Sequence, residues 1–329
     1  TVNLVRQEHP ILIDKYIRGK ELEVDAVCDG KDILIPGIME HIERTGIHSG
    51  DSISVYPAKS VSDHVKRTIT LYTEKLARAL HVTGMINIQF IAAGETVYII
   101  EVNPRSSRTV PFLSKATGYS LADIATLVML GKSLAEQGIN TIYPPEKKRH
   151  YVKAPAFSFS KLSGMDSYLS PEMKSTGEAI GYDDKLHRAM YKAFVASGIR
   201  MQNYGTVVVT LADEDKEEAL PLVKRFYDMG FNIEATAGTA KFLKENGIRT
   251  RALKKVSESD DIVSALRQGH IAYVINTGDV ADMGLHNDGY VIRTVAAENC
   301  ISTFTALDTV KVLLDVLEET TICVSTIDS

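Results

Sequence analysis

The sequence lacks several features that mark specialised classes of protein. It has no tryptophan, and its three cysteines, Cys28, Cys300 and Cys323, lie far apart without paired spacing. A disulfide framework or a zinc site is therefore not expected, and a reducing cytoplasm suits the chain best. No apolar run is long enough to span a bilayer, and no signal peptide is found.

Basic residues are not in excess either. The 329 residues include 37 Lys and Arg against 42 Asp and Glu, a formal net charge of −5. This balance argues against nucleic acid or an anionic membrane as a partner. Hydrophobic residues make up 44% and charged residues 24%, which is typical of a globular protein of two or three domains. An initiator methionine is missing before the strand-like ILIDKYI, so we expect a segment of a longer protein.

The pattern of the chain changes near Gly198. Before it, ELEVDAVCDGKDILIPGIME and GMINIQFIAAGETVYIIEVNPR each predict a β-hairpin, with a helix over residues 62–80 between them. Another helix is expected from about Ser120, because Ser120 and Asp123 have the spacing of a capping box. After Gly198, strands alternate with helices, which predicts a doubly wound parallel sheet.

Oxygen-bearing side chains gather on the second hairpin. Glu101 and Asn103 are two residues apart on a strand and so share one face. Gln89 joins that face if the loop of the hairpin has an odd number of residues. One carboxylate and two amide oxygens suit Mg²⁺ or Mn²⁺ held partly by phosphate. Arg105 and Arg108 follow directly and would bind phosphate oxygens, although an exposed strand end carries similar residues in many proteins.

A second set of polar residues follows the strands of the later part. Thr236 and Thr239 flank the start of a helix, where backbone N–H groups and hydroxyls can bind phosphate. Lys216 begins a helix, Lys255 follows the strand TRAL, and Asn276 ends the strand AYVIN. In an open α/β sheet the carboxyl ends of the strands surround one crevice. Plain helix capping by the threonines and a solvated lysine are the alternatives.

Three blocks of sequence resemble signatures of carbamoyl phosphate synthase large subunits. EVNPRSSRTVPFLSKATG resembles their ATP-grasp signature, and EHIERTGIHSGDS and SPEMKSTGE resemble two further blocks. The segment after Gly198 resembles the methylglyoxal-synthase-like domain that follows the second half of those subunits. Other ATP-grasp enzymes, such as biotin carboxylase, would share only the E-x-N-x-R core.

The resemblance implies a fold class and an organisation. Residues 1–140 would be the carboxy-terminal part of an incomplete ATP-grasp α+β domain, 141–197 a connecting region, and 198–329 a doubly wound, methylglyoxal-synthase-like allosteric domain. The implied enzyme is a ligase that phosphorylates carbamate with ATP, for pyrimidine or arginine synthesis, together with a glutaminase small subunit. The glycine-rich phosphate loop and its lysine are not found, so the fragment alone is expected to be inactive.

The resemblance also implies roles for the hairpin residues. Gln89, Glu101 and Asn103 map to ligands of Mg²⁺ or Mn²⁺, with Gln89 and Glu101 also at the ATP site. Arg105 and Arg108 map to contacts with phosphate or carbamate.

Three residues before the hairpin are implied in nucleotide and cation binding. Glu21 maps to a contact with the ATP ribose and a monovalent cation such as K⁺, and His48 and Ser52 map to the same site. Each has an ordinary alternative: an exposed glutamate at a strand start, a solvated loop histidine, and a serine that satisfies its own turn. No role is assigned to the side chain of His41.

In the later part the resemblance implies binding without catalysis. NTGDVADMG departs from the aspartate-bearing loop of methylglyoxal synthase, so Lys216, Thr236, Thr239, Lys255 and Asn276 would form an allosteric site for UMP or another phosphorylated effector. Some relatives also bind ornithine between the domains.

Two acidic residues match such ornithine-binding positions. They are Glu43 and Asp51, but Val152 stands where a third acidic group is expected, which argues against ornithine activation. Two other readings of the whole chain stay open: another ATP-grasp ligase that acts on a carboxylate, and a nucleotide-sensing module without catalysis.

Overall fold

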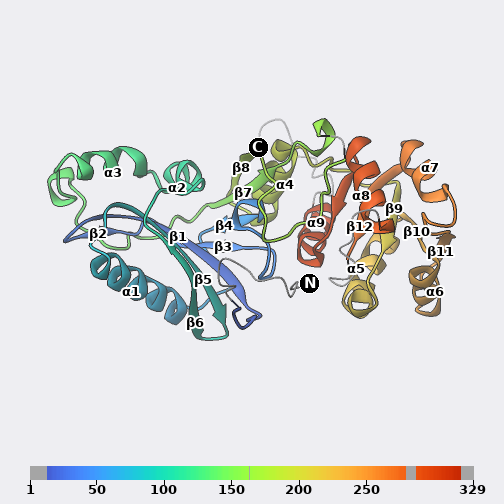
Figure 1. Ribbon diagram of the computed structural model, residues 1–329, viewed down its shortest axis with the longest axis horizontal. Coiled ribbons are helices and arrows are strands. Elements are labelled where there is room, and N and C mark those ends of the chain that lie inside the picture. The colour runs from blue at the N-terminus through green and yellow to red at the C-terminus, as the bar shows by residue number, and fades with distance from the viewer. Residues whose placement is uncertain (1–12, 163, 279–286, 320–329) are drawn as a thin grey trace, which may run out of the picture.

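The computed structural model describes residues 13–162, 164–278 and 287–319. Within these ranges the chain forms two β-sheets of different construction, which lie at opposite ends of the molecule in Figure 1. The first sheet is antiparallel, and the second is parallel with helices on both faces. This arrangement confirms the predicted fold class. No described helix is long and apolar enough to cross a membrane.

The first sheet is built from strands spread over residues 20–183. Its strands are β1 (Lys20–Asp29), β2 (Ile33–Leu34), β3 (Met39–His41), β4 (Ser54–Tyr56), β5 (Thr83–Ala93), β6 (Thr96–Asn103), β7 (His150–Ala156) and β8 (Gly177–Asp183). The order across the sheet is β6-β5-β1-β3-β4-β7-β8, and β2 pairs with β1. The accompanying helices are α1 (Asp63–Ala79), α2 (Val110–Thr117), α3 (Leu121–Met129) and α4 (Leu186–Ser197), with short 3₁₀ turns η1 (Ser49–Asp51), η2 (Ala135–Gln137) and η3 (Phe159–Lys161).

The second sheet has the order β11-β10-β9-β12-β13. Its strands are β9 (Thr206–Thr210), β10 (Asn232–Thr236), β11 (Thr250–Leu253), β12 (Ile271–Asn276) and β13 (Ser302–Phe304). Its helices are α5 (Lys216–Asp228), α6 (Ala237–Glu245), α7 (Asp261–Arg267), α8 (Asp288–Glu298) and α9 (Leu307–Glu319), and the turn η4 (Asp213–Asp215) precedes α5. The first strand of this unit therefore lies beside its fourth, which creates a topological switch point between β9 and β12.

The two faces of β1 have different surroundings. Leu22, Val24 and Ala26 pack into an apolar cluster under α1, while Val27 packs on the opposite side among residues of α2 and α3. Figure 1 shows α1 on one side of this sheet and α2 and α3 on the other. Because side chains alternate along a strand, Glu21, Glu23 and Asp25 lie on the same face as Val27. That face is therefore apolar at one end of β1 and charged at the other.

The helix starts follow the sequence signals, with one difference. The Ser62 hydroxyl accepts a hydrogen bond from the N–H of Val65, as expected for the start of α1. Ser120 does precede α3, but its hydroxyl donates to the Asp123 carboxylate at 2.5 Å and does not cap the helix. The predicted capping box is therefore wrong, because the Ser120 hydroxyl bonds to the Asp123 side chain and not to a backbone N–H of the helix.

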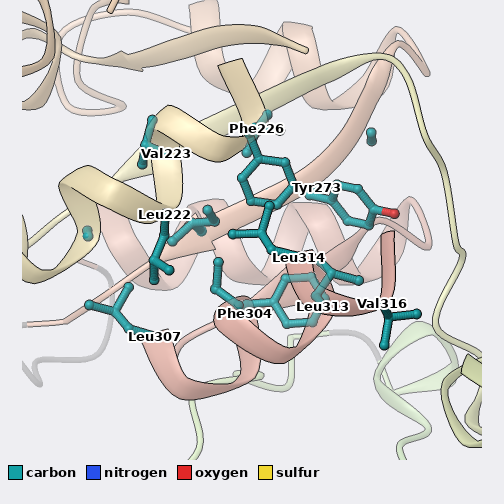
Figure 2. Close-up of a cluster of buried hydrophobic side chains, with 14 of the residues drawn as sticks. Leu222, Val223, Phe226, Tyr273, Phe304, Leu307, Leu313, Leu314 and Val316 are labelled. Atoms are coloured by element: carbon teal, nitrogen blue, oxygen red, sulfur yellow. The ribbon is translucent and has the colours of Figure 1, made fainter. Parts of the chain in front are cut away.

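Opposite faces of the second sheet are covered by different helices. Val207 and Val209 pack with α5, α6 and α9, whereas Val208 packs with α7 and α8. Figure 2 shows the first of these cores, where Phe226 of α5 and Tyr273 of β12 meet leucines of α9. The same apolar cluster continues into β4 and β7 of the other sheet and into α4, so the two parts share one core, and β7 and β8 of the expected connecting region are strands of the first sheet.

The core in Figure 2 generates a stability prediction. Phe226 is fully buried and packs edge-on against Phe231, with ring centroids 5.3 Å apart. Phe226→Ala should lower the free energy of unfolding by about 3–5 kcal/mol, because it leaves a cavity in a packed core. Urea unfolding followed by far-UV circular dichroism measures this. Tyr204→Ala is the control, since Tyr204 is 78% exposed and its loss should cost below about 0.5 kcal/mol. Equal midpoints for the two variants would contradict the prediction.

Candidate functional site

A β-bulge places the predicted metal ligands on one face. The loop between β5 and β6 has two residues, Gly94 and Glu95, so the odd loop on which the alignment was predicted to depend is not present. An uninterrupted register would pair Gln89 with Ile100 and turn Glu101 to the other face. The pairing shifts by one residue directly after Gln89, so Gln89 lies opposite Glu101. The side chains expected to share a face therefore do share it, for a different reason.

The same face carries two asparagines next to this pair. Asn87 lies opposite Asn103, whose amide donates to Glu101 Oε1 at 2.8 Å and lies 3.5 Å from Asn87 Oδ1. The Gln89 amide donates to the hydroxyl of Ser49 at 2.9 Å. Glu101 is exposed, so its carboxylate is accessible to a ligand.

The oxygens of this face fit a hard divalent cation only in part. Within the described ranges, no group of three or more His, Cys, Asp or Glu side chains could hold a metal ion. Gln89, Glu101 and Asn103 supply one carboxylate and two amides. Such a set suits Mg²⁺ or Mn²⁺ that takes its remaining ligands from water and phosphate, and does not suit a cation held by protein alone.

A buried cluster of charge lies next to these residues. His41 is 1% exposed, with its Nδ1 3.2 Å from Glu21 Oε2 and its Nε2 3.3 Å from Glu23 Oε2. Burial by itself lowers the pKa of His41, but the hydrogen bonds to the two carboxylates raise it to about 9. Burial by itself raises the pKa of Glu23, but the hydrogen bond to His41 and the charge of His41 lower this pKa to about 2. The histidine is therefore a cation that bridges two carboxylates.

Asp25 completes this cluster, and its pKa shifts in the direction opposite to that of Glu23. Burial, and then the charge of Glu23, raise the pKa of Asp25 to about 8. The amide of Asn87 donates to Glu23 at 2.8 Å and to Asp25 at 3.1 Å, and the Ser107 hydroxyl donates to Asp25 at 2.8 Å. Asp25 thus anchors the loop that carries the two predicted arginines.

The loop around η1 lies over this face. His48 Nδ1 accepts the N–H of Gly50 at 3.0 Å, and the buried Ser52 hydroxyl donates to the His48 carbonyl at 3.4 Å. Both side chains therefore stabilise their own turn, which matches the ordinary alternative for Ser52, whereas His48 is half-buried and is not a solvated loop histidine. The fully buried Lys153 reaches the same loop and donates to the Ser49 carbonyl at 3.0 Å.

The two arginines differ in their surroundings. Arg105 is exposed and donates only to the carbonyl of Ser106, at 3.0 Å, among the described residues. Arg108 crosses to another segment, where its Nη1 donates to the carbonyl and hydroxyl of Ser175 at 3.3 and 3.2 Å. Arg108 also approaches Met173 Sδ at 2.9 Å. Its guanidinium is thus held, and that of Arg105 is free to meet solvent.

The predicted effector residues gather at the carboxyl edge of the parallel sheet. Asn276 ends β12 at the switch point, is 3% exposed, and donates to the hydroxyl of Thr210 at the end of β9. The Thr239 hydroxyl accepts the N–H of Leu211 at 3.3 Å and lies 3.4 Å from the hydroxyl of Thr236. Neither threonine caps α6 through its side chain. The alternative of plain capping is therefore not what the structure shows.

The two lysines lie at the same edge. Lys216 pairs with Asp213 at 2.5 Å, and a Cβ on Gly238 would lie 3.9 Å from its ammonium group, which places it over the start of α6. Lys255 follows β11 and is exposed. Most of the divergent segment NTGDVADMG lies outside the described residues.

A cavity of about 370 Å³ is lined by residues from both parts of the chain. Glu43 and Asp51 line it, as does Thr309, whose hydroxyl donates to Glu43 at 2.9 Å. Burial raises the pKa of Glu43. Val152, which stands where a third acidic group was expected, is buried in the apolar cluster and does not line the cavity.

Two family models match the chain. Residues 4–137 match the model described as "Carbamoyl-phosphate synthase L chain, ATP binding domain", and residues 218–305 match the MGS-like domain. The first match covers the exposed hairpin face, the histidine cluster and the η1 loop. The second covers most of the parallel sheet and its carboxyl edge. The amino-terminal part is thus of the ATP-grasp type, and the later part is of the MGS-like type.

Solved structures show a weaker likeness. The chain is similar to the "Biotin Carboxylase domain of single-chain bacterial carboxylase", with 16% identity, a TM-score of 0.45, and coverage of 55% of this chain and 48% of that one. It is also similar to "a single-chain, multi-domain long-chain acyl-coa carboxylase", with 17% identity, a TM-score of 0.43, and coverage of 54% and 22%. The chain thus spans about half the length of the first structure and about a fifth of the second.

Sequence reasoning missed part of the site. His41 received no role, and Glu23, Asp25, Asn87 and Lys153 were not singled out. Their shared signal was present in the sequence: charged or amide residues at alternate positions of strands that are otherwise apolar. Buried charged and amide side chains need hydrogen-bonding partners. The pairing of β1 with β3 and β5 shows which side chains are those partners.

The His41 cluster predicts a titration. The pKa of His41 lies above its ordinary value of 6.5, so protonation stabilises the fold below pH 6.5, and this contribution is lost as the pH rises through about 9. Glu23→Gln should lower the pKa of His41 by about one unit or more, as measured by NMR of ¹³C-histidine-labelled chain. Glu95→Gln, on the exposed hairpin loop, should leave it unchanged. A His41 midpoint that is the same in all three proteins would contradict this account.

Proposed function

We propose that the chain is the carboxy-terminal part of a carbamoyl phosphate synthase large subunit, a cytoplasmic ligase that works with a glutaminase small subunit. One observation carries the proposal: an ATP-binding domain of the synthase L-chain type and an MGS-like domain occur in this order on one chain. In this proposal the first sheet supplies part of a site that phosphorylates carbamate, and the second sheet binds a phosphorylated effector.

The exposed face of β5 and β6 supports the first assignment. In the proposed reaction a carbamate oxygen attacks the γ-phosphorus of ATP, and the bond to the β,γ-bridging oxygen breaks, so that ADP leaves with that electron pair. Carbamate is already an anion, so no general base is needed and none is assigned to His48. A divalent cation, when bound by Gln89, Glu101 and Asn103, neutralises charge on the phosphates.

The arginines would act on the same charge. Arg105 is exposed and can turn towards phosphate oxygens, and Arg108 is already positioned by Ser175. A fixed guanidinium such as that of Arg108 stabilises the charge that develops on a transferring phosphoryl group without reorganising during the reaction. Behind them, Glu21 and the cationic His41 provide a rigid charged floor, where a monovalent cation such as K⁺ and the ribose would bind beside His48 and Ser52.

The carboxyl edge of the parallel sheet supports the second assignment. The start of α6 presents backbone N–H groups, and Thr236, Thr239 and Lys216 lie around it. This is the chemistry that holds a phosphate monoester. Lys255 and Asn276 flank the same edge, Asn276 at the switch point where ligands of open α/β sheets bind. The proposed effector is UMP or a related phosphorylated compound.

The metal assignment has a direct test. Glu101→Gln should weaken Mn²⁺ binding in the presence of ADP by about tenfold or more, because it removes the only charged ligand of the set. Mn²⁺ titration followed by electron paramagnetic resonance measures the free ion. Glu74→Gln, on α1, is the control and should bind like the unmodified chain. Equal affinity of Glu101→Gln and the unmodified chain would exclude Glu101 as a ligand.

The effector assignment is tested separately with UMP. Thr239→Ala should weaken UMP binding by about tenfold, because a buried hydroxyl at the start of α6 is lost. Isothermal titration calorimetry gives the dissociation constant. Glu101→Gln serves here as the control and should keep full affinity for UMP. Loss of UMP binding in both variants would mean one shared site in place of two.

A further inference from the structure

An arginine of α8 joins the proposed effector crevice to the segment between β7 and β8. Arg293 is 4% exposed, and its Nη1 donates to Asn276 Oδ1 at 2.5 Å. The other side of the same guanidinium makes two parallel hydrogen bonds to Asp166, from Nε at 2.6 Å and from Nη2 at 2.7 Å. A guanidinium shared in this way transmits a change in one partner to the other, because its planar fork moves as a unit.

Two neighbours keep this arginine in place. Its guanidinium lies over the ring of Tyr168, 5.2 Å from the centroid. Gly289 provides the space, since a Cβ there would lie 2.9 Å from Arg293 Nη1. Burial raises the pKa of Asp166, but the bonds from Arg293 and from the N–H of Tyr168 outweigh it, so the pKa falls below its usual value. The pair is therefore an ion pair at neutral pH.

The segment that begins at Asp166 continues to the candidate active site. The Lys174 ammonium donates to the Tyr168 carbonyl, and the N–H groups of Lys174 and Ser175 donate to the buried Asp51 carboxylate at 2.7 and 2.8 Å. Ser175 then accepts the hydrogen bonds of Arg108. Each of these contacts involves a buried or half-buried group, so each is weakly screened by solvent.

The segment also contacts the η1 loop directly. The N–H of His48 donates to the carbonyl of Ser170 at 2.9 Å, and the Ser175 hydroxyl donates to the carbonyl of Gly50 at 3.1 Å. One continuous set of hydrogen bonds thus runs from the end of β12 to the loop that holds Gln89 and to the arginine that follows β6.

We propose that Asp166 is a positioning residue that couples occupancy of the effector crevice to the placement of Arg108 and the η1 loop, through its ion pair with Arg293. This inference rests on the proposed function, because it takes the carboxyl edge of the parallel sheet as the effector site. A phosphorylated effector that bonds to Asn276 competes with or reinforces the hydrogen bond between Asn276 and Arg293. A shift of the Arg293 guanidinium then alters its two hydrogen bonds to Asp166. Coupling of this kind needs a differential contact in the two states, and Asn276 provides it.

The experiment compares three chains by calorimetry and by hydrogen–deuterium exchange, with UMP as the probe and inorganic phosphate as a second probe. In the unmodified chain, UMP should change the exchange of backbone amides in residues 166–175 and 48–52 by about tenfold. Asp166→Asn should bind UMP within about threefold of the unmodified chain, yet lose the change in both segments. Asp184→Asn, which removes an exposed ion pair with Arg149, should behave like the unmodified chain.

Each result separates the two proposals. If neither UMP nor phosphate binds the unmodified chain, the effector site is wrong and the coupling falls with it. If UMP binds but exchange in residues 166–175 is unchanged, or is changed equally in Asp166→Asn, only the coupling is overturned. Gly289→Ala tests the contact between Arg293 and Asp166 by displacing Arg293, and it serves if Asp166→Asn does not fold. It should displace Arg293 and abolish the exchange response, and a preserved response would also overturn the coupling.

Discussion

The structure depends on a buried histidine that holds two carboxylates inside a sheet. Charges removed from water destabilise a fold unless each one meets a partner, and here His41 provides that partner for both Glu21 and Glu23. The arrangement is possible only if β1 pairs with β3 in one register, because a shift by one residue would turn the carboxylates towards the apolar core under α1. The electrostatics of the site and the register of the sheet therefore constrain one another.

This charged floor determines what can be built above it. Asp25 extends the cluster to the loop after β6 through Ser107, and Asn87 links it to the neighbouring strand. The exposed Glu101 and the half-buried Gln89 and Asn103 thus lie on a face whose buried charges are already paired. A phosphate or a divalent cation can approach them without first breaking buried bonds, which is the property that a site for phosphoryl transfer requires.

The two parts of the chain are joined by the hydrogen bonds of one irregular segment, as well as by a shared apolar core. Residues 166–175 bond to Arg293 of α8 at one end and to Asp51 and Arg108 at the other. Because these bonds are shared by groups from both sheets, neither sheet can move far without a change in the segment. The cavity lined by Glu43 and Asp51 lies beside the same stretch, and Ser167 and Leu169 line it too.

Much of the fold and of the candidate site followed from the sequence alone. The alternation ELEVDAVCDG and the buried-type strands after Gly198 predicted antiparallel and parallel sheets, since periodicity of apolar residues reflects which faces are buried. The sequence also singled out Glu101, Asn103 and the Thr236–Thr239 turn as candidates, and the structure places each on the sheet face or edge that was expected. It did not identify the bulge after Gln89, the role of His41 or the ion pair of Asp166 with Arg293. Those features join residues that are distant in the chain. Strand register and the pairing of buried charges depend on contacts between such residues, and only the tertiary structure decides them.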